Sequence, residues 1–297
     1  MPTELPKTFN MRLKCGKCGH TADYQLTKII ISPAAAKAKN PTESISFGDY
    51  FRCRQCQSAW PWEFTGDAHL TLTGLLANSL AGNKDERIIF GIPQLFDGTP
   101  FLSAAQAEEH LLGLLEREPE NSFVWDRLGN VYEQAGMTEK AKQAFVKALE
   151  VDPKNIESHY SLGYQFFDEG RLQEAAQYFH QVITFAREYQ HLPEKRLRET
   201  VYDTLGVLVN LAVSTNGEIP VLPVQPLEPS ANPDKPALIY LTEFDLAKES
   251  ERQRLVDLVL GKGRAPIKTP KGRQWISKEV PARPGGRVRN HKRHHRK

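Results

Sequence analysis

The chain has 297 residues, long enough for about two domains. Hydrophobic residues make up 40% and charged residues 25%, as in globular proteins with a buried core. No run of about 18 apolar residues is present, which argues against a membrane span, and the first ten residues lack the apolar stretch of a secretory signal. We therefore expect a cytoplasmic protein.

The net charge of +3 conceals a strong asymmetry along the chain. Residues 261–297 contain 13 Lys or Arg and one acid, Glu279, a net charge of +12. The other 260 residues consequently carry −9. This distribution predicts an acidic folded body followed by a basic tail.

All four cysteines lie near the N-terminus, in two pairs with two residues between the partners. Two such turns bring four sulfurs into the tetrahedral arrangement of a closed structural Zn²⁺ site, which leaves no position open for a substrate. A redox iron site and a pair of disulfides are the alternatives, and disulfides are rare in the cytosol. The candidate ligands are Cys15, Cys18, Cys53 and Cys56.

Segments rich in Ile and aromatic residues flank the cysteines and are expected to form strands. With the cysteine pairs they resemble a rubredoxin-like zinc ribbon, which implies small antiparallel sheets held by one metal in a domain of residues 1–66. Gln57 departs from that family, because a glycine is usual after the last cysteine. The segments are 10–14, 24–32, 45–52 and 59–65.

Residues 67–101 are predicted to be a connector that packs on the ribbon. Leu70 to Thr73 and Arg87 to Phe90 are consistent with two further strands, and Asp97 and Gly98 indicate a turn. At Ser103 a capping box begins a helical segment.

Two successive segments carry the same residue types 34 positions apart, and seven of nine positions keep their size class. The pattern resembles the tetratricopeptide repeat, which implies stacked pairs of antiparallel helices. We expect the array over residues 102–214, with full repeats at about 122–155 and 156–189 and a half repeat on either side. The matched positions are Trp125, Leu128, Gly129, Tyr132, Gly136, Ala141, Phe145, Ala148 and Pro153, and in the second segment His159, Leu162, Gly163, Phe166, Gly170, Ala175, Phe179, Val182 and Arg187.

Within the first repeat the residue types suggest separate tasks. Gly129 permits a close approach between helices, Phe145 fills the space between them, and Gly136 suits the turn that ends the first helix. Thr138 and Asn155 are predicted helix N-caps.

The resemblance also implies a concave face lined by the first helix of each repeat. These residues are acidic and aromatic, so we expect a basic or aromatic protein or peptide as partner. A polar face without a ligand and the chain's own basic tail are the alternatives. The predicted groove residues are Phe123, Asp126, Asn130, Glu133, Glu157, Tyr160, Tyr164 and Phe167.

Beyond the array, prolines predict an extended linker over 215–236. Residues 237–260 contain an apolar segment at 237–242, consistent with a strand, and a helix at 250–260 closed by Gly261. The apolar stripe on that helix is predicted to dock on the array or to bind a partner; it comprises Leu255, Val256, Leu258 and Val259.

Residues 261–297 have few apolar groups and are expected to be disordered alone. Their charge favours contact with RNA, DNA or the ribosome through phosphates. A nuclear-import or anionic-lipid segment and a solubilising tail are the alternatives. The basic residues expected to contribute most are Arg287, Arg289, Lys292, Arg293, Arg296 and Lys297.

Together these features predict an α+β multidomain protein: a small antiparallel zinc ribbon, a helical solenoid and a disordered basic tail. We recognise no catalytic motif and expect no enzyme activity. The favoured function is a protein-interaction adaptor whose tail contacts nucleic acid or the ribosome. The alternatives are an assembly factor that does not bind nucleic acid and a rubredoxin-like redox carrier.

Overall fold

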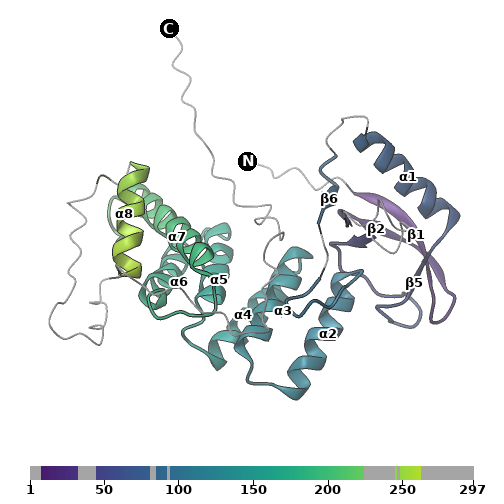
Figure 1. Cartoon of the computed structure of the whole chain (residues 1–297), viewed down its shortest axis with the longest axis horizontal. Helices are drawn as coiled ribbons and strands as arrows, with labels where there is room; N and C mark the ends of the chain where they lie inside the picture. The colour runs from purple at the N-terminus through teal and green to yellow at the C-terminus, as the bar shows by residue number, and fades with distance from the viewer. Residues whose placement is uncertain are drawn as a thin grey trace, which may run out of the picture. The chain divides into compact units, whose positions relative to one another are not determined.

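The computed structural model describes residues 8–32, 45–80, 85–91, 94–223, 245 and 248–261. Within these residues the chain forms two compact units, one ending at Ala107 and one beginning at Glu108. Small sheets are followed by helices, as the α+β prediction requires (Figure 1). The strand predicted at 237–242 and the basic tail lie outside the described residues.

The first sheet of the N-terminal unit is antiparallel and has three strands. Its centre is β1 (Phe9–Cys15), which pairs with β2 (Thr21–Leu26) on one side and with β5 (Trp62–Phe64) on the other. In this register Cys15 lies opposite Trp62, so the first cysteine pair begins where the central strand ends.

The second sheet also has three strands, with β3 (Ile29–Ile31) at its centre. It pairs antiparallel with β4 (Ile45–Phe47) and parallel with β6 (Ile88–Phe90). The strand predicted around Arg87 to Phe90 is thereby confirmed, and its role is to complete the sheet that β3 begins.

A corner separates β2 from β3, although the sequence predicted one strand over 24–32. The Asp49 carboxylate produces this corner by accepting hydrogen bonds from the Thr27 amide at 3.0 Å and from the Thr27 hydroxyl at 2.7 Å. It also accepts one from the Lys28 amide at 3.3 Å. These bonds provide acceptors for the Thr27 and Lys28 amides, which lie between the two sheets.

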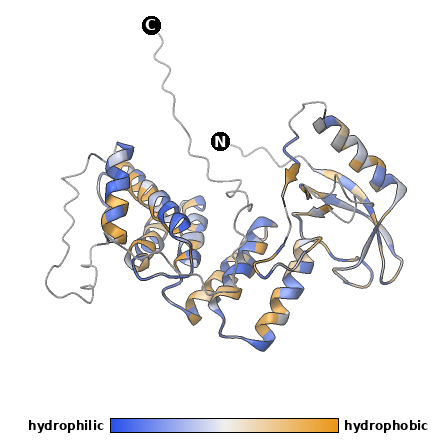
Figure 2. Cartoon of the chain, in the orientation of Figure 1, coloured by the Kyte–Doolittle hydropathy of each residue, from blue (hydrophilic) through white to orange (hydrophobic). Residues whose placement is uncertain are grey.

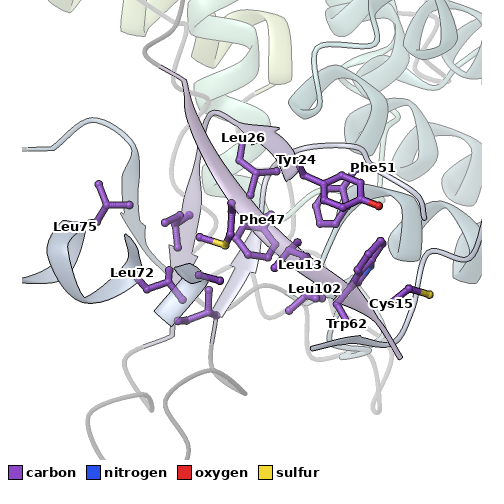
Figure 3. Packing of buried hydrophobic residues seen from close by; sticks show 14 of the residues in the cluster. Leu13, Cys15, Tyr24, Leu26, Phe47, Phe51, Trp62, Leu72, Leu75 and Leu102 are labelled. Carbon is purple, nitrogen blue, oxygen red and sulfur yellow. The ribbon is translucent and has the colours of Figure 1, made fainter. Parts of the chain in front are cut away.

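Helix α1 (Gly66–Leu80) occupies the segment where Leu70 to Thr73 were predicted to form a strand, and that prediction is wrong. The alternation of Leu and Thr suggested a period of two, but Leu70 is 73% exposed. The buried positions are Ala68, Leu72 and Leu75, whose spacing is helical. They pack into the cluster that contains the strand side chains (Figure 3).

The core of the N-terminal unit is aromatic and lies next to the cysteines. The Tyr24 ring is 5.3 Å from Phe51 and 5.1 Å from Trp62, measured between centroids. Leu13 and Phe47 lie in the same cluster, which Figure 3 shows close to Cys15. The cysteines thus lie against a packed hydrophobic cluster.

The C-terminal unit is helical, and consecutive helices from α3 to α8 pack against one another. Each of these helices carries both hydrophobic and hydrophilic residues, as Figure 2 shows. No helix in the described part of the chain is long and apolar enough to span a bilayer. The helices are α2 (Ala104–Arg117), α3 (Ser122–Gln134), α4 (Thr138–Val151), α5 (Ile156–Asp168), α6 (Leu172–Phe185), α7 (Glu194–Ser214) and α8 (Glu249–Leu260).

Helix α8 closes the far end of the array by packing on α7. Leu255, Val256 and Val259 are buried, which confirms that this apolar stripe docks on the array. An ion pair of 2.6 Å joins Arg198 of α7 to Asp257 of α8. Gly261 ends the helix with φ 78°, as predicted.

Candidate metal centre and repeat array

The first cysteine pair lies in a tight turn that follows β1. The Gly19 amide donates to the Cys15 carbonyl at 2.8 Å, and the Cys15 amide donates to the His20 carbonyl at 2.9 Å. Gly19 has φ 76°, a conformation that favours glycine. The Gly16 amide also donates to the Pro61 carbonyl at 2.9 Å, which ties the turn to the chain entering β5.

The second pair repeats this turn. The Gln57 amide donates to the Cys53 carbonyl at 2.9 Å, and the Cys53 amide donates to the Ser58 carbonyl at 2.9 Å. Gln57 occupies the position of Gly19 and has φ 60°. The departure from the family pattern at residue 57 therefore changes the side chain and keeps the backbone geometry.

We expect Gln57→Gly to raise the free energy of unfolding by about 1 kcal/mol, because a side chain at positive φ clashes with its own backbone and glycine does not. Thermal or chemical denaturation of the metal-loaded protein measures the change. Gly19→Ala is the matched variant and is expected to lower stability. Equal stability of Gln57→Gly and the unaltered chain would contradict the strain at this turn.

The two turns bring the four sulfurs together. The Cys15 and Cys56 sulfurs are 3.7 Å apart, and the Cys18 and Cys53 sulfurs are 3.6 Å apart. All four lie within 4.8 Å of one another. Tetrahedral coordination with metal–sulfur bonds of about 2.3 Å separates sulfurs by about 3.8 Å, so the cluster fits such a metal ion.

The thiols also have unequal tendencies to ionise. Burial raises the pKa of Cys53, but the backbone amides of Cys56 and Gln55 and the neighbouring thiols outweigh it and lower this pKa to about 7. The His20 amide lowers the pKa of Cys18, yet desolvation and hydrogen bonds with the other cysteines raise it to about 12. Four thiolates at this distance repel one another, so a divalent cation is needed for all four to ionise.

In the helical unit, one hydrogen bond recurs at a spacing of 34 residues. The Trp125 indole N–H donates to the Pro119 carbonyl at 2.9 Å. The His159 Nε2–H donates to the Pro153 carbonyl at 2.8 Å. Both bonds fasten the first helix of a repeat to the turn before it, so histidine replaces the tryptophan in the second repeat.

The helix N-caps follow the same spacing. Asn155 accepts from the Ser158 amide at 3.1 Å, as predicted, and Asn121 accepts from the Val124 amide at 3.2 Å. The predicted cap at Thr138 is wrong, because Met137 is the N-cap of α4 and no side chain caps that helix. Asn121 was missed, although it lies 34 residues before Asn155.

Close helix contacts recur as well. A Cβ atom on Gly129 would lie 2.4 Å from the Phe145 ring, and one on Gly163 would lie 2.7 Å from the Phe179 ring. Both phenylalanines are fully buried. The predicted pairing of a small residue on one helix with a large one on the next is confirmed.

These recurring contacts describe two successive helical hairpins of the same design. A tetratricopeptide repeat model matches residues 124–155. No curated protein matches the sequence. A tetratricopeptide repeat supports a role in binding other proteins, so the comparison agrees with the predicted interaction role.

The predicted groove residue Asp126 is unavailable to a ligand, because its side chain is fully buried. The Ser158 hydroxyl donates to the Asp126 carboxylate at 2.8 Å, and the Asn130 side-chain amide donates to the same carboxylate at 2.9 Å. Asp126 joins α3 to α5, and this correction removes one acid from the predicted binding face.

Arg127 changes the charge of the face further. Its guanidinium pairs with Glu157, lies 3.7 Å from Asp126, and covers the Phe123 ring at 4.4 Å. Burial alone would lower the pKa of Arg127, but the carboxylates of Glu157 and Asp126 have the larger effect, so this pKa is raised. The Tyr189 hydroxyl donates to Glu157 at 2.9 Å. Arg127 therefore offsets one of the two negative charges predicted at 126 and 157, and neutral hydrogen-bond donors contact both carboxylates.

The remaining predicted groove residues stay half-buried on α3 and α5. The Tyr160 and Tyr164 rings are 4.8 Å apart. Glu133 accepts from the Gln165 amide at 3.4 Å. Phe167 is half-buried one turn beyond Tyr164. The six tail residues Arg287, Arg289, Lys292, Arg293, Arg296 and Lys297 lie outside the described part of the chain.

His159 is expected to make the stability of the array depend on pH. Burial lowers the pKa of His159 below its ordinary value of 6.5, although Pro153 and Asp152 oppose the shift, and Nδ1 is buried without a partner. The unfolded state then binds the proton more readily, so the free energy of unfolding should fall as pH drops below about 6.5. We expect His159→Trp to make the free energy of unfolding depend less on pH. Denaturation at pH values from about 7.5 to about 5, the range in which histidine titrates, measures this change. An unchanged pH dependence would rule out His159 as its source.

Proposed function

We propose that this chain is a non-enzymatic, cytoplasmic adaptor that binds another protein through its tetratricopeptide array. The observation that supports this most is the pair of hairpins with the same caps, hydrogen bonds and glycine–phenylalanine contacts 34 residues apart. The first helix of the second hairpin, α5, presents half-buried aromatic residues, Tyr160, Tyr164 and Phe167. A rigid array with such a face suits an extended segment of a partner.

Site-specific photo-cross-linking tests this function. Replacing Phe167 of α5 with benzoylphenylalanine keeps the aromatic character at the predicted face. We expect it to cross-link one partner protein, which mass spectrometry identifies together with the attached peptide. The same group at Gln177, an exposed residue of α6, is the control and should not capture that partner. Absent or equal cross-linking at both positions would count against the proposal.

We propose that the cysteine centre holds one structural Zn²⁺. Its four sulfurs are Cys15, Cys18, Cys53 and Cys56, and they fit a tetrahedral ion with every position taken by protein. The ion would supply cohesion to the small β unit and leaves no site for a substrate. Elemental analysis should give one zinc per chain and a colourless protein. A red protein with iron would favour the redox-carrier alternative.

The basic tail is proposed to contact RNA, DNA or the ribosome through phosphates. A chain ending at Gly261 should lose most affinity for single-stranded RNA. In the full chain, the logarithm of affinity should fall with the logarithm of salt concentration with a slope of about 0.7 per phosphate contacted. Fluorescence anisotropy at several salt concentrations measures both. Equal binding by the two chains would favour the assembly-factor alternative, in which the tail contributes only charge.

A further inference from the structure

Asp203 is an acid on the exposed surface of α7. It lies on the side of α7 that faces α5, because the Tyr160 hydroxyl donates to its carboxylate over a long 3.5 Å. Among the described residues, no lysine or arginine pairs with it. Desolvation and then the neighbouring Glu199 raise the pKa of Asp203, and the hydrogen bond from Tyr160 opposes this shift.

The other acids of this part of the array are treated differently. Asp126 receives hydrogen bonds from Ser158 and Asn130, and Glu157 pairs with Arg127. Glu199, one turn before Asp203, lies 3.1 Å from Arg196. Asp203 is exposed, and among the described residues its contact is the long hydrogen bond from Tyr160, so it differs from acids that hold the helices together.

Two tyrosine rings stand beside this carboxylate. Tyr160 and Tyr164, one turn apart on α5, have their centroids 4.8 Å apart and their planes at 65°. The buried Phe179 supports both rings, 5.2 Å from Tyr164 and 6.5 Å from Tyr160. Angled aromatic rings next to a carboxylate bind organic cations, because the faces and the acid both attract positive charge.

We propose that Tyr160, Tyr164 and Asp203 form a subsite that binds the guanidinium or ammonium group of an arginine or lysine in a partner peptide. The proposal rests on the proposed peptide-binding function of the array. It places recognition between α5 and α7, away from Asp126 and Glu157, which share the Arg127 guanidinium. Charge complementarity selects the partner, since a neutral or acidic side chain would leave Asp203 uncompensated.

Selection of a phage-displayed random peptide library on the full chain tests this subsite. We expect the enriched peptides to share an arginine or lysine. Replacing that residue with glutamine should weaken binding about tenfold to the unaltered chain and little to Asp203→Asn. Glu199→Gln is the matched control, because it removes a neighbouring charge that already has a partner. Binding is measured by fluorescence anisotropy with the selected peptides.

Thermal melting of Asp203→Asn checks its fold, and we expect it to melt close to the temperature of the unaltered chain because Asp203 is exposed. Peptides that bind equally to Asp203→Asn, or lose affinity equally in Glu199→Gln, would overturn the subsite and leave the adaptor function standing. Enrichment of no peptide, with no partner cross-linked at Phe167, would overturn both.

Discussion

Removing the metal is expected to unfold the N-terminal β unit and to leave helices α3 to α7 folded. The cysteine turns fasten the end of β1 to the chain before β5, and apparent binding energies of structural zinc are about 10–16 kcal/mol. That is comparable to the stability of an ordinary domain, about 5–15 kcal/mol. Cys53→Ser should have the same effect as a chelator. Hydrogen exchange of β1 and β2 amides, compared with those of α4 and α5, measures it.

Lys17→Ala is the matched control for this experiment, since Lys17 lies exposed within the first cysteine turn and supplies no ligand. It should keep both the metal and the slow exchange of β1. Restoring zinc to the chelated protein should restore protection. If β1 stays protected without metal, the aromatic cluster of Tyr24, Phe51 and Trp62 is sufficient to hold the sheet.

The features that were predicted correctly are those encoded by short or periodic patterns. Two cysteine pairs place four sulfurs together whatever the length of the loop between them. The 34-residue spacing predicts the helix pairs because each repeat must bury the same face against its neighbour. Gly261 ends α8 because its conformation depends on adjacent residues only.

The features that were missed depend on contacts between distant segments. Asp49 breaks the predicted strand at Thr27, and nothing near either residue indicates that bond. The alternation of Leu and Thr within α1 has the two-residue period of a strand, so the sequence predicts a strand there. Leu72 is buried because α1 packs on the sheet, which the local sequence does not indicate. These are tertiary effects that override local preference.

The position of the binding face stays a prediction from the sequence, and the structure corrects the charge expected there. The family positions identify the helix side, and Tyr160 and Tyr164 lie there. Arg127 follows the predicted groove residue Asp126 in the sequence. It is absent from the predicted groove because it is not at one of the groove positions of the family. Asp203 was omitted because the Leu-Gly pair of α7 comes nine residues later than the 34-residue spacing requires.

Gly129→Ala and Gly206→Ala are expected to change stability in opposite directions, although both glycines follow a leucine. Gly129 lies in α3 and Gly206 in α7. A Cβ on Gly129 would lie 2.4 Å from the Phe145 ring, which is fully buried and must move. Overpacking of this kind costs about 1–3 kcal/mol, and we expect the upper part of that range. A Cβ on Gly206 meets nothing within 4 Å. Alanine there should stabilise α7 by about 0.5–1 kcal/mol through helix propensity.

Chemical denaturation of both variants, followed by far-ultraviolet circular dichroism, gives the two changes. Gly163→Ala should behave like Gly129→Ala, because its Cβ would lie 2.7 Å from Phe179. The difference between the three positions reports where a second helix packs closely. The Phe145 ring packs on α3 and the Phe179 ring on α5, whereas no ring of the described residues lies within 4 Å of a Cβ at Gly206. Destabilisation by Gly206→Ala as large as that by Gly129→Ala would contradict this interpretation. It would mean that a second helix packs against Gly206 of α7 as closely as α4 packs against Gly129 of α3.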